Sequence, residues 1–148
     1  MNNEDIAGFM LDGWYVFDSY APFQIEWKGK LWPTAEHAFQ AAHFFETDPE
    51  LAEKVRLTRS PREADDFANK NKQFDDPEWR SKRVAIMEEI IRVKYDQHPL
   101  IQETLAKTGS KLIVETNYND AFWGWGNDKK GENTLGKIWM KLRDEASS

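Results

Sequence analysis

Apolar residues recur with a helical period in the segment that follows Pro33. They are Ala35, Ala38, Phe39 and Ala42. Positions i, i+3, i+4 and i+7 share one face of a helix. Thr34 is a favoured N-cap residue, and the proline closes the segment before it. The pattern therefore predicts a helix that begins directly after Thr34.

A stripe of polar residues follows a different face of the same predicted helix. Glu36, Gln40 and His43 have the i, i+4, i+7 spacing that brings side chains together along one face. An acid, an amide and an imidazole in one line are unusual for packing alone. Glu36 has two interpretations. It is either a first-turn acid that complements the helix dipole, or a carboxylate that stabilises an oxocarbenium-like transition state or activates water.

Patterns elsewhere predict short strands in the first third of the chain and helices after it. The aromatic and β-branched run 14–17 predicts a strand, and Lys28-Gly29 predicts a hairpin turn between strands at 24–27 and 30–32. Capping residues and prolines place the expected helices over 49–57, 61–70, 76–98 and 99–107, with a last helix after Asn133. A short strand is expected over 111–115.

Two of these helices have a clear apolar face. The expected core positions are Val84, Met87, Ile90 and Ile91 on the long helix, and Leu135, Ile138, Trp139 and Leu142 on the last. No repeat or linker divides the chain. We therefore expect a single α+β domain over residues 1–148, dominated by helices and with a small antiparallel sheet.

Composition narrows the function classes. A chain of 148 residues without cysteine excludes disulfides, thiolate metal sites and cysteine nucleophiles, and three scattered histidines argue against a metal centre. The N-terminal stretch lacks the basic and apolar regions of a signal peptide, and no apolar run reaches membrane-spanning length. A cytoplasmic protein without membrane, metal or cofactor is expected. The net charge of −6 argues against coating nucleic acid by bulk electrostatics.

The segment from Asn117 to Asn133 predicts a long loop rich in Asn, Asp, Gly and Trp. Asp120 precedes Trp123 and Trp125 within it, which makes a compact group of one acid and two aromatic rings. In a functional interpretation, a Trp stacks on a flat base while Asp120 holds sugar hydroxyls or a leaving-group nitrogen. In a structural one, both rings fill the core and Asp120 is a turn residue.

Three further positions have similar alternatives. Asn133 and Gly136 lie at the start of the last predicted helix, where free N–H groups either receive a phosphate or are simply capped. Trp79 lies in the first turn of the long helix and is either a packing residue or part of a pocket wall.

Taken in order, the motifs resemble the NADAR family, also called YbiA-like proteins. The resemblance runs from Phe17 to Arg143 and includes Tyr20-Ala21-Pro22-Phe23, WPTAEHAFQA, LIVE, DAFWGWG and GENTLGKIWMKLR. It implies an α+β domain that hydrolyses N-glycosidic bonds. Two substrate classes are implied: phosphoribosyl intermediates of riboflavin biosynthesis, and ADP-ribose attached to guanine, as a free nucleotide or in nucleic acid.

The resemblance assigns roles to single residues. The family's active-site Glu falls on Glu36, its loop acid and Trp on Asp120 and Trp123, its helix-start Trp on Trp79, and its Asn-x-Leu-Gly segment on 133–136.

This chain also departs from the family in two places. His43 stands where members usually carry Lys, and the acidic stretch 74–78 stands where they tend to carry basic residues.

The resulting hypothesis is a metal-free N-glycosidase. Glu36 would stabilise the ribosyl cation or activate water, and Asp120 would hold the ribose or assist the leaving group. The substrate would be bound by Trp79, Trp123, Trp125, Asn133 and Gly136, while Gln40 and His43 would either orient Glu36 or contact the substrate. Two other classes compete with it: a module that binds NAD or ADP-ribose without catalysis, and a small structural domain.

Overall fold

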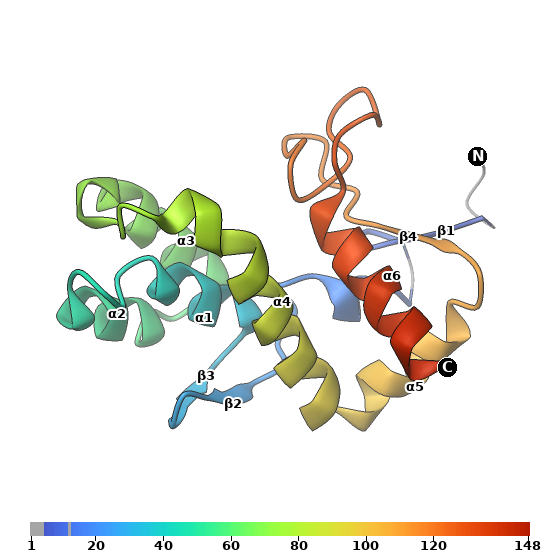
Figure 1. Cartoon of the computed structure of the whole chain (residues 1–148), viewed down its shortest axis with the longest axis horizontal. Coiled ribbons are helices and arrows are strands. Elements are labelled where there is room, and N and C mark those ends of the chain that lie inside the picture. The colour runs from blue at the N-terminus through green and yellow to red at the C-terminus, as the bar shows by residue number, and fades with distance from the viewer. Residues whose placement is uncertain (1–4, 12) are drawn as a thin grey trace. The chain divides into compact units, whose positions relative to one another are not determined.

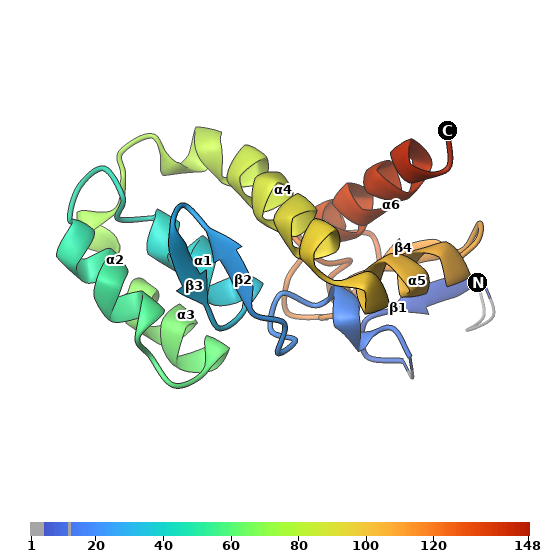
Figure 2. The same cartoon turned by 90° about the horizontal axis from the view of Figure 1, so that it is seen from below.

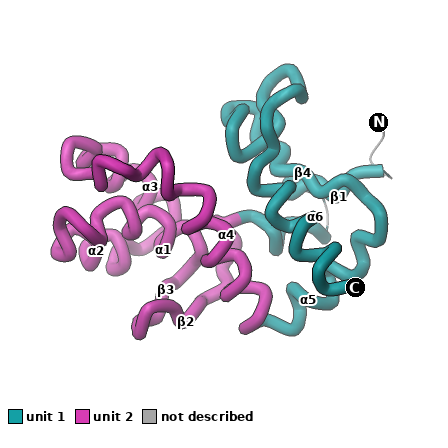
Figure 3. The backbone as a smooth tube through the Cα atoms, viewed as in Figure 1, with its two compact units in different colours: residues 1–18, 98–148 teal, residues 19–97 magenta. Residues whose placement is uncertain are grey.

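The computed structural model describes residues 5–11 and 13–148. The chain forms two compact units (Figure 3). One comprises residues 1–18 and 98–148, and the other comprises residues 19–97. Helices predominate beside two pairs of short strands, one of them antiparallel, so the predicted α+β class is confirmed. No helix in the described part of the chain has both the length and the apolar character needed to cross a membrane.

The 19–97 unit is built around one short buried helix. Its elements are β2 (Ile25–Trp27), β3 (Lys30–Trp32), α1 (Ala35–Ala42), α2 (Pro49–Arg56), α3 (Pro61–Lys70), the 3-10 helix η2 (Lys72–Phe74) and α4 (Trp79–Gln97). Helix α1 packs against α2, α3 and α4 (Figure 1). All eight residues of α1 are buried, its polar residues included. The β2–β3 hairpin lies beside α4 (Figure 2).

Local signals set the element boundaries of this unit. The side chain of Thr34 accepts a hydrogen bond from the backbone N–H of His37 at 3.1 Å, which confirms the predicted start of α1. Ser60 accepts one from the N–H of Glu63 in the same way at 3.0 Å. The predicted hairpin is also confirmed. Lys28 and Gly29 both adopt positive φ, at 52° and 77°, the conformation that a tight turn matched to the strand twist requires.

The other unit joins the two ends of the chain. Its elements are β1 (Ile6–Gly8), the 3-10 helix η1 (Tyr15–Phe17), α5 (Pro99–Lys107), β4 (Leu112–Val114) and α6 (Thr134–Ala146). Strands β1 and β4 pair in parallel, and α6 packs against β4 (Figure 1). Trp139 of α6 is fully buried, and its Nε1 donates to the carbonyl oxygen of Phe17 at 3.0 Å. The predicted apolar face of α6 is buried as expected.

Two predictions about elements were wrong. The run 14–17 was expected to be a strand, but Tyr15–Phe17 is a 3-10 helix. There the N–H of Phe17 donates to the carbonyl of Trp14 at 3.2 Å, and the two rings stack 6.3 Å apart. The turn accompanies the packing of Phe17 against Trp139, whose ring centroids are 4.9 Å apart. Val84 was expected in the core of α4 but is 38% exposed, because the side that meets the rest of this unit starts further along the helix, at Met87.

Candidate active site

The carboxylate of Glu36 is buried and held by two side-chain donors. Glu36 lies in the first turn of α1 and is 6% exposed. Ser19 Oγ donates to Oε1 at 2.7 Å, and Gln40 Nε2 donates to Oε2 at 2.7 Å. Hydrogen bonds of this kind favour the ionised carboxylate. The predicted contact between Glu36 and Gln40 is therefore present, and the carboxylate is fixed in orientation at both oxygens.

Tyr20 adds a polar neighbour to this carboxylate. Its Oη donates to Asp65 Oδ2 at 2.8 Å. The pKa of Tyr20 is raised well above its usual value, first by burial, then by the negative charge of Glu36, and then by Asp65. The phenol therefore stays protonated and acts as a hydrogen-bond donor.

Sequence reasoning assigned no role to Ser19, Tyr20 or Asp65. Tyr20 had a usable signal, since it opens one of the matched family motifs. Ser19 and Asp65 had none, because each reaches this group from a separate element.

His43 and Trp79 lie face to face at the end of α1. Their rings stack with centroids 3.9 Å apart and an interplanar angle of 29°. His43 Nδ1 lies 3.1 Å from Asp75 Oδ1 in the turn before α4, and the edge of Phe39 packs against the imidazole. Burial lowers the pKa of His43, and the neighbouring Asp75 carboxylate opposes this effect. Two predicted site residues are thus brought together, with Asp75 as a partner that the sequence did not indicate.

Asp120 organises the long loop of the other unit. Its Oδ1 accepts hydrogen bonds from the backbone N–H groups of Phe122 and Trp123, at 3.0 and 2.8 Å. These are the contacts of a turn residue, as the structural interpretation expected. Within the described residues, Oδ2 makes no hydrogen bond or ion pair. One oxygen therefore holds the loop, and the other stays available for a ligand.

The two loop tryptophans are held differently. Trp125 donates its Nε1 to the carbonyl of Thr116 at 3.2 Å, and the ammonium of Lys129 lies 5.3 Å from its ring centroid. The rings of Trp123 and Phe122 lie nearly perpendicular, with centroids 4.9 Å apart. Both rings are only partly buried, so neither is a plain core residue.

Asn133 was expected to cap α6. It precedes the helix as expected, but its side chain makes no capping hydrogen bond. Its backbone is in the left-handed region, with φ 51°. Its side-chain amide bonds to the backbone of β4 and of the residue that follows this strand. Oδ1 accepts from the N–H of Glu115 at 3.0 Å, and Nδ2 donates to the carbonyl of Ile113 at 2.9 Å. A Cβ on Gly136 would collide with that same carbonyl and with the Asn133 amide. Close packing of α6 on β4 thus explains both residues structurally, and a role toward substrate stays a prediction.

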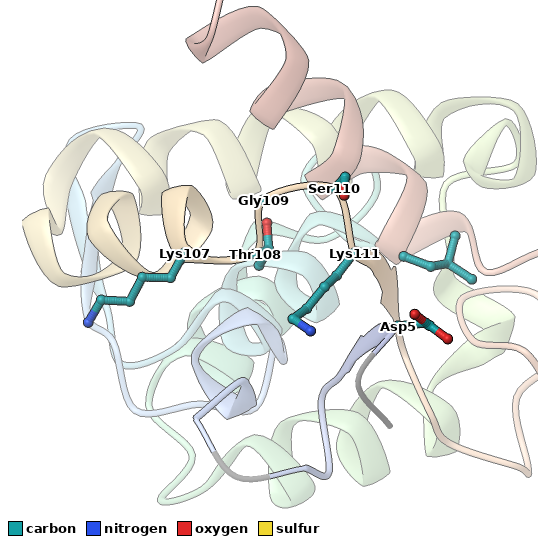
Figure 4. Close-up of a pocket in the computed structure, with 7 residues that line it drawn as sticks. Asp5, Lys107, Thr108, Gly109, Ser110 and Lys111 are labelled. Atoms are coloured by element: carbon teal, nitrogen blue, oxygen red, sulfur yellow. The ribbon is translucent and has the colours of Figure 1, made fainter. Parts of the chain in front are cut away.

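The predicted site residues divide between the two units. Residues 19–97 contain Glu36, Gln40, His43 and Trp79, and the other unit contains Asp120, Trp123, Trp125, Asn133 and Gly136. A surface pocket of about 510 Å³ contains none of them (Figure 4). It is lined by Asp5 and residues 107–112. Among the described residues, no group of three or more His, Asp and Glu side chains could hold a metal ion.

Comparison with known proteins places this geometry in context. A family model described as the NADAR domain matches residues 3–146. The N-glycosidase YbiA of Escherichia coli (strain K12) is 34% identical over 134 residues, which cover 90% of this chain and 82% of that protein. An N-glycosidase of Nostoc punctiforme is 33% identical over 130 residues, or 87% of this chain and 83% of that protein.

Two further matches extend the comparison. A riboflavin biosynthesis protein of Vibrio vulnificus is 35% identical over 127 residues, which cover 86% of this chain but 34% of that protein. The NMR structure of E. coli YbiA superimposes with a TM-score of 0.86 at 32% identity, covering 99% of this chain and 88% of that one.

Proposed function

The chain belongs to the NADAR family and is an N-glycosidase, and from this premise we propose that it hydrolyses the bond between a ribosyl group and a heterocycle nitrogen by means of Glu36. One observation carries the assignment to this residue. Glu36 is a buried acid whose two oxygens are each held at 2.7 Å by a side-chain donor. A solvent-facing acid that only complemented the helix dipole would need neither burial nor such partners.

The chemistry requires a fixed anion beside the sugar. As the bond from C1′ to nitrogen breaks, its electron pair leaves with the heterocycle and positive charge builds on the ribosyl group. The Glu36 carboxylate stabilises that charge and accepts the proton of the water that adds to C1′. Ser19 and Gln40 hold the carboxylate in place before reaction, so little reorganisation is needed.

The proposed substrate is a nucleotide-like compound in the cytoplasm. Relatives named as riboflavin biosynthesis proteins favour a phosphoribosyl intermediate of that chemistry. ADP-ribose on guanine, in a nucleotide or in nucleic acid, is the second member of the class. In this proposal Asp120 contacts the ribose or the leaving group through Oδ2, and Asn133 and Gly136 offer backbone N–H groups to phosphate.

Tryptophans would form the walls of the substrate site. Trp123 and Trp125 are only partly buried and so present ring surface to a heterocycle. Trp79 packs against His43 and Phe39 but is only partly buried, and its remaining surface would contact the substrate. Gln40 contributes indirectly in this proposal, by orienting Glu36.

Product analysis tests the proposal. The wild-type protein, Glu36→Gln and the exposed control Glu103→Gln are incubated separately with a phosphoribosyl riboflavin intermediate and with ADP-ribosylated guanosine, and products are separated by chromatography. Wild type and the control should release free heterocycle from at least one compound. Glu36→Gln should lose activity by about 10²–10³-fold, the scale for one preorganised electrostatic group.

Two results would count against it. Turnover by Glu36→Gln at the wild-type rate would remove Glu36 from the mechanism. Tight binding of ADP-ribose by calorimetry, without turnover of either compound, would instead favour a non-catalytic binding module.

A further inference from the structure

An imidazole and a carboxylate form a pair beside the Glu36 stripe. His43 Nδ1 and Asp75 Oδ1 are 3.1 Å apart. A carboxylate only accepts, so Nδ1 carries the hydrogen and donates it to Asp75. This leaves Nε2 as the atom that gains or loses a proton. Within the described residues Nε2 makes no hydrogen bond, and the His43 side chain is 14% exposed.

The ring is held rigidly in that orientation. The Trp79 ring stacks on the imidazole with centroids 3.9 Å apart, and the Phe39 ring lies nearly perpendicular to it with centroids 5.8 Å apart. The backbone adds a further restraint, because the N–H of Asp76 donates to the carbonyl of His43 at 2.8 Å. Asp76 is itself paired with Lys82. An imidazole fixed on several sides, with one nitrogen open, suits proton transfer better than packing alone.

Its position relative to Glu36 suits a single ribosylated heterocycle. His43 follows Glu36 by two helical turns on the same stripe, about 10 Å along the axis at ~1.5 Å per residue. If the Glu36 carboxylate lies beside C1′ of the substrate, the His43 imidazole therefore lies beside the part of the heterocycle that is farther from C1′. We propose that His43, oriented by Asp75, is the general acid that protonates the departing heterocycle. This inference rests on the proposed function.

The proton balance is complete with water alone. The bond from C1′ to nitrogen breaks, and its electron pair enters the heterocycle. The Nε2–H of protonated His43 transfers its proton to an acceptor atom of the heterocycle, which leaves neutral. Water adds to C1′ and loses a proton to Glu36. Glu36 then releases this proton to solvent, and His43 takes one up, so each turnover consumes one water.

The surrounding charges set the pH at which the acid works. Burial holds the pKa of His43 below its usual 6.5, the charge of Asp75 and its hydrogen bond raise it, Asp65 raises it further, and Lys72 lowers it. Because the donor must be protonated, kcat should fall as the pH rises through this pKa. Removing Asp75 should therefore move the fall to lower pH.

The experiment measures kcat against pH for the full chain, with whichever of the two compounds the wild type hydrolyses. His43→Gln should abolish the alkaline fall and lower kcat about 100-fold at its acidic plateau. His43→Lys should keep a proton, and hence activity, to higher pH. Asp75→Asn should move the fall about one pH unit lower. The exposed control Asp144→Asn should leave the profile unchanged.

A substrate-free measurement completes the test. Proton NMR of the imidazole should show His43 titrating at lower pH in Asp75→Asn than in wild type, which checks the pair even if His43→Gln does not fold. An unchanged kcat profile in Asp75→Asn overturns the inference, and so does His43→Gln with the alkaline fall intact. If one of these two results is found but Glu36→Gln loses activity, only the inference about His43 is wrong and the proposed function is retained. Full activity in Glu36→Gln removes both.

Discussion

Ser19→Ala is the most informative perturbation of the Glu36 site, because it removes one donor and little else. Ser19 is 6% exposed and donates to Glu36 Oε1 at 2.7 Å, while Gln40 keeps the other oxygen. A hydrogen bond to a charged group contributes about 1.5–3 kcal/mol. Its loss disfavours the ionised form by that amount, which corresponds to roughly one to two pH units.

The expected outcome has a direction in pH. Because the proposed mechanism needs an ionised Glu36, the acid limb of the kcat profile should move to higher pH by about one to two units in Ser19→Ala. Folding stability near neutral pH should fall by about 1.5–3 kcal/mol, since a buried carboxylate loses a partner. Steady-state rates from pH 4 to 9 and urea unfolding at pH 7.5 give the two readouts. Ser81→Ala, an exposed serine on α4, is the matched control.

A double-mutant cycle isolates the interaction. If Ser19 acts through the charge of Glu36, Ser19→Ala should cost much less stability in the Glu36→Gln background. Equal costs in both backgrounds, or a pH profile that superimposes on the wild type, would refute the reasoning that Ser19 holds an ionised carboxylate.

Three further predictions concern stability. Gly136→Ala should destabilise the protein by about 1–3 kcal/mol in urea unfolding, because the added methyl meets the Ile113 carbonyl and α6 must shift. A more stable variant would contradict this packing. Trp139→Phe should lower the unfolding free energy by at least about 1–3 kcal/mol in the same assay, because the buried carbonyl of Phe17 loses its hydrogen-bond donor. A loss below 0.5 kcal/mol would argue against that bond. Burial lowers the pKa of His37, so the unfolded chain binds the proton more readily. The contribution of His37 to the unfolding free energy should therefore be fully present above pH 6.5. It should be lost as the pH falls through the pKa of His37 in the folded state. His37→Gln should flatten that decline in melts from pH 7.5 to 5.

Features with local causes were predictable from the sequence. The start of α1 follows from Thr34, the turn of the β2–β3 hairpin from Lys28-Gly29, and the start of α3 from Ser60 and Pro61. In each case the deciding hydrogen bond or backbone angle lies within a few residues. The aromatic run at 14–17 was misread for the opposite reason. Its conformation depends on where Phe17 packs, which local propensity does not contain.

The candidate site divides along the same line. Glu36 and Gln40 could be paired from the sequence, because helix geometry brings i and i+4 together. Ser19 lies 17 residues from Glu36, and Asp75 lies 32 residues from His43, so no periodic pattern links either pair. Asn133 was assigned to the right boundary, but its amide bonds to a strand that precedes the loop.

The sequence by itself determined the helical framework, the polar stripe and the family, because these follow from spacing and from motifs in order. Only the tertiary structure decided how the carboxylate of Glu36 is held. The stripe alone allowed a solvent-facing acid, whereas burial of all eight residues of α1 makes Glu36 a desolvated carboxylate with two fixed donors. The tertiary structure also showed that His43, which the sequence marked only as a departure from the family motif, is paired with Asp75. Burial and long-range pairing depend on which elements pack together, and that information is distributed over the whole chain.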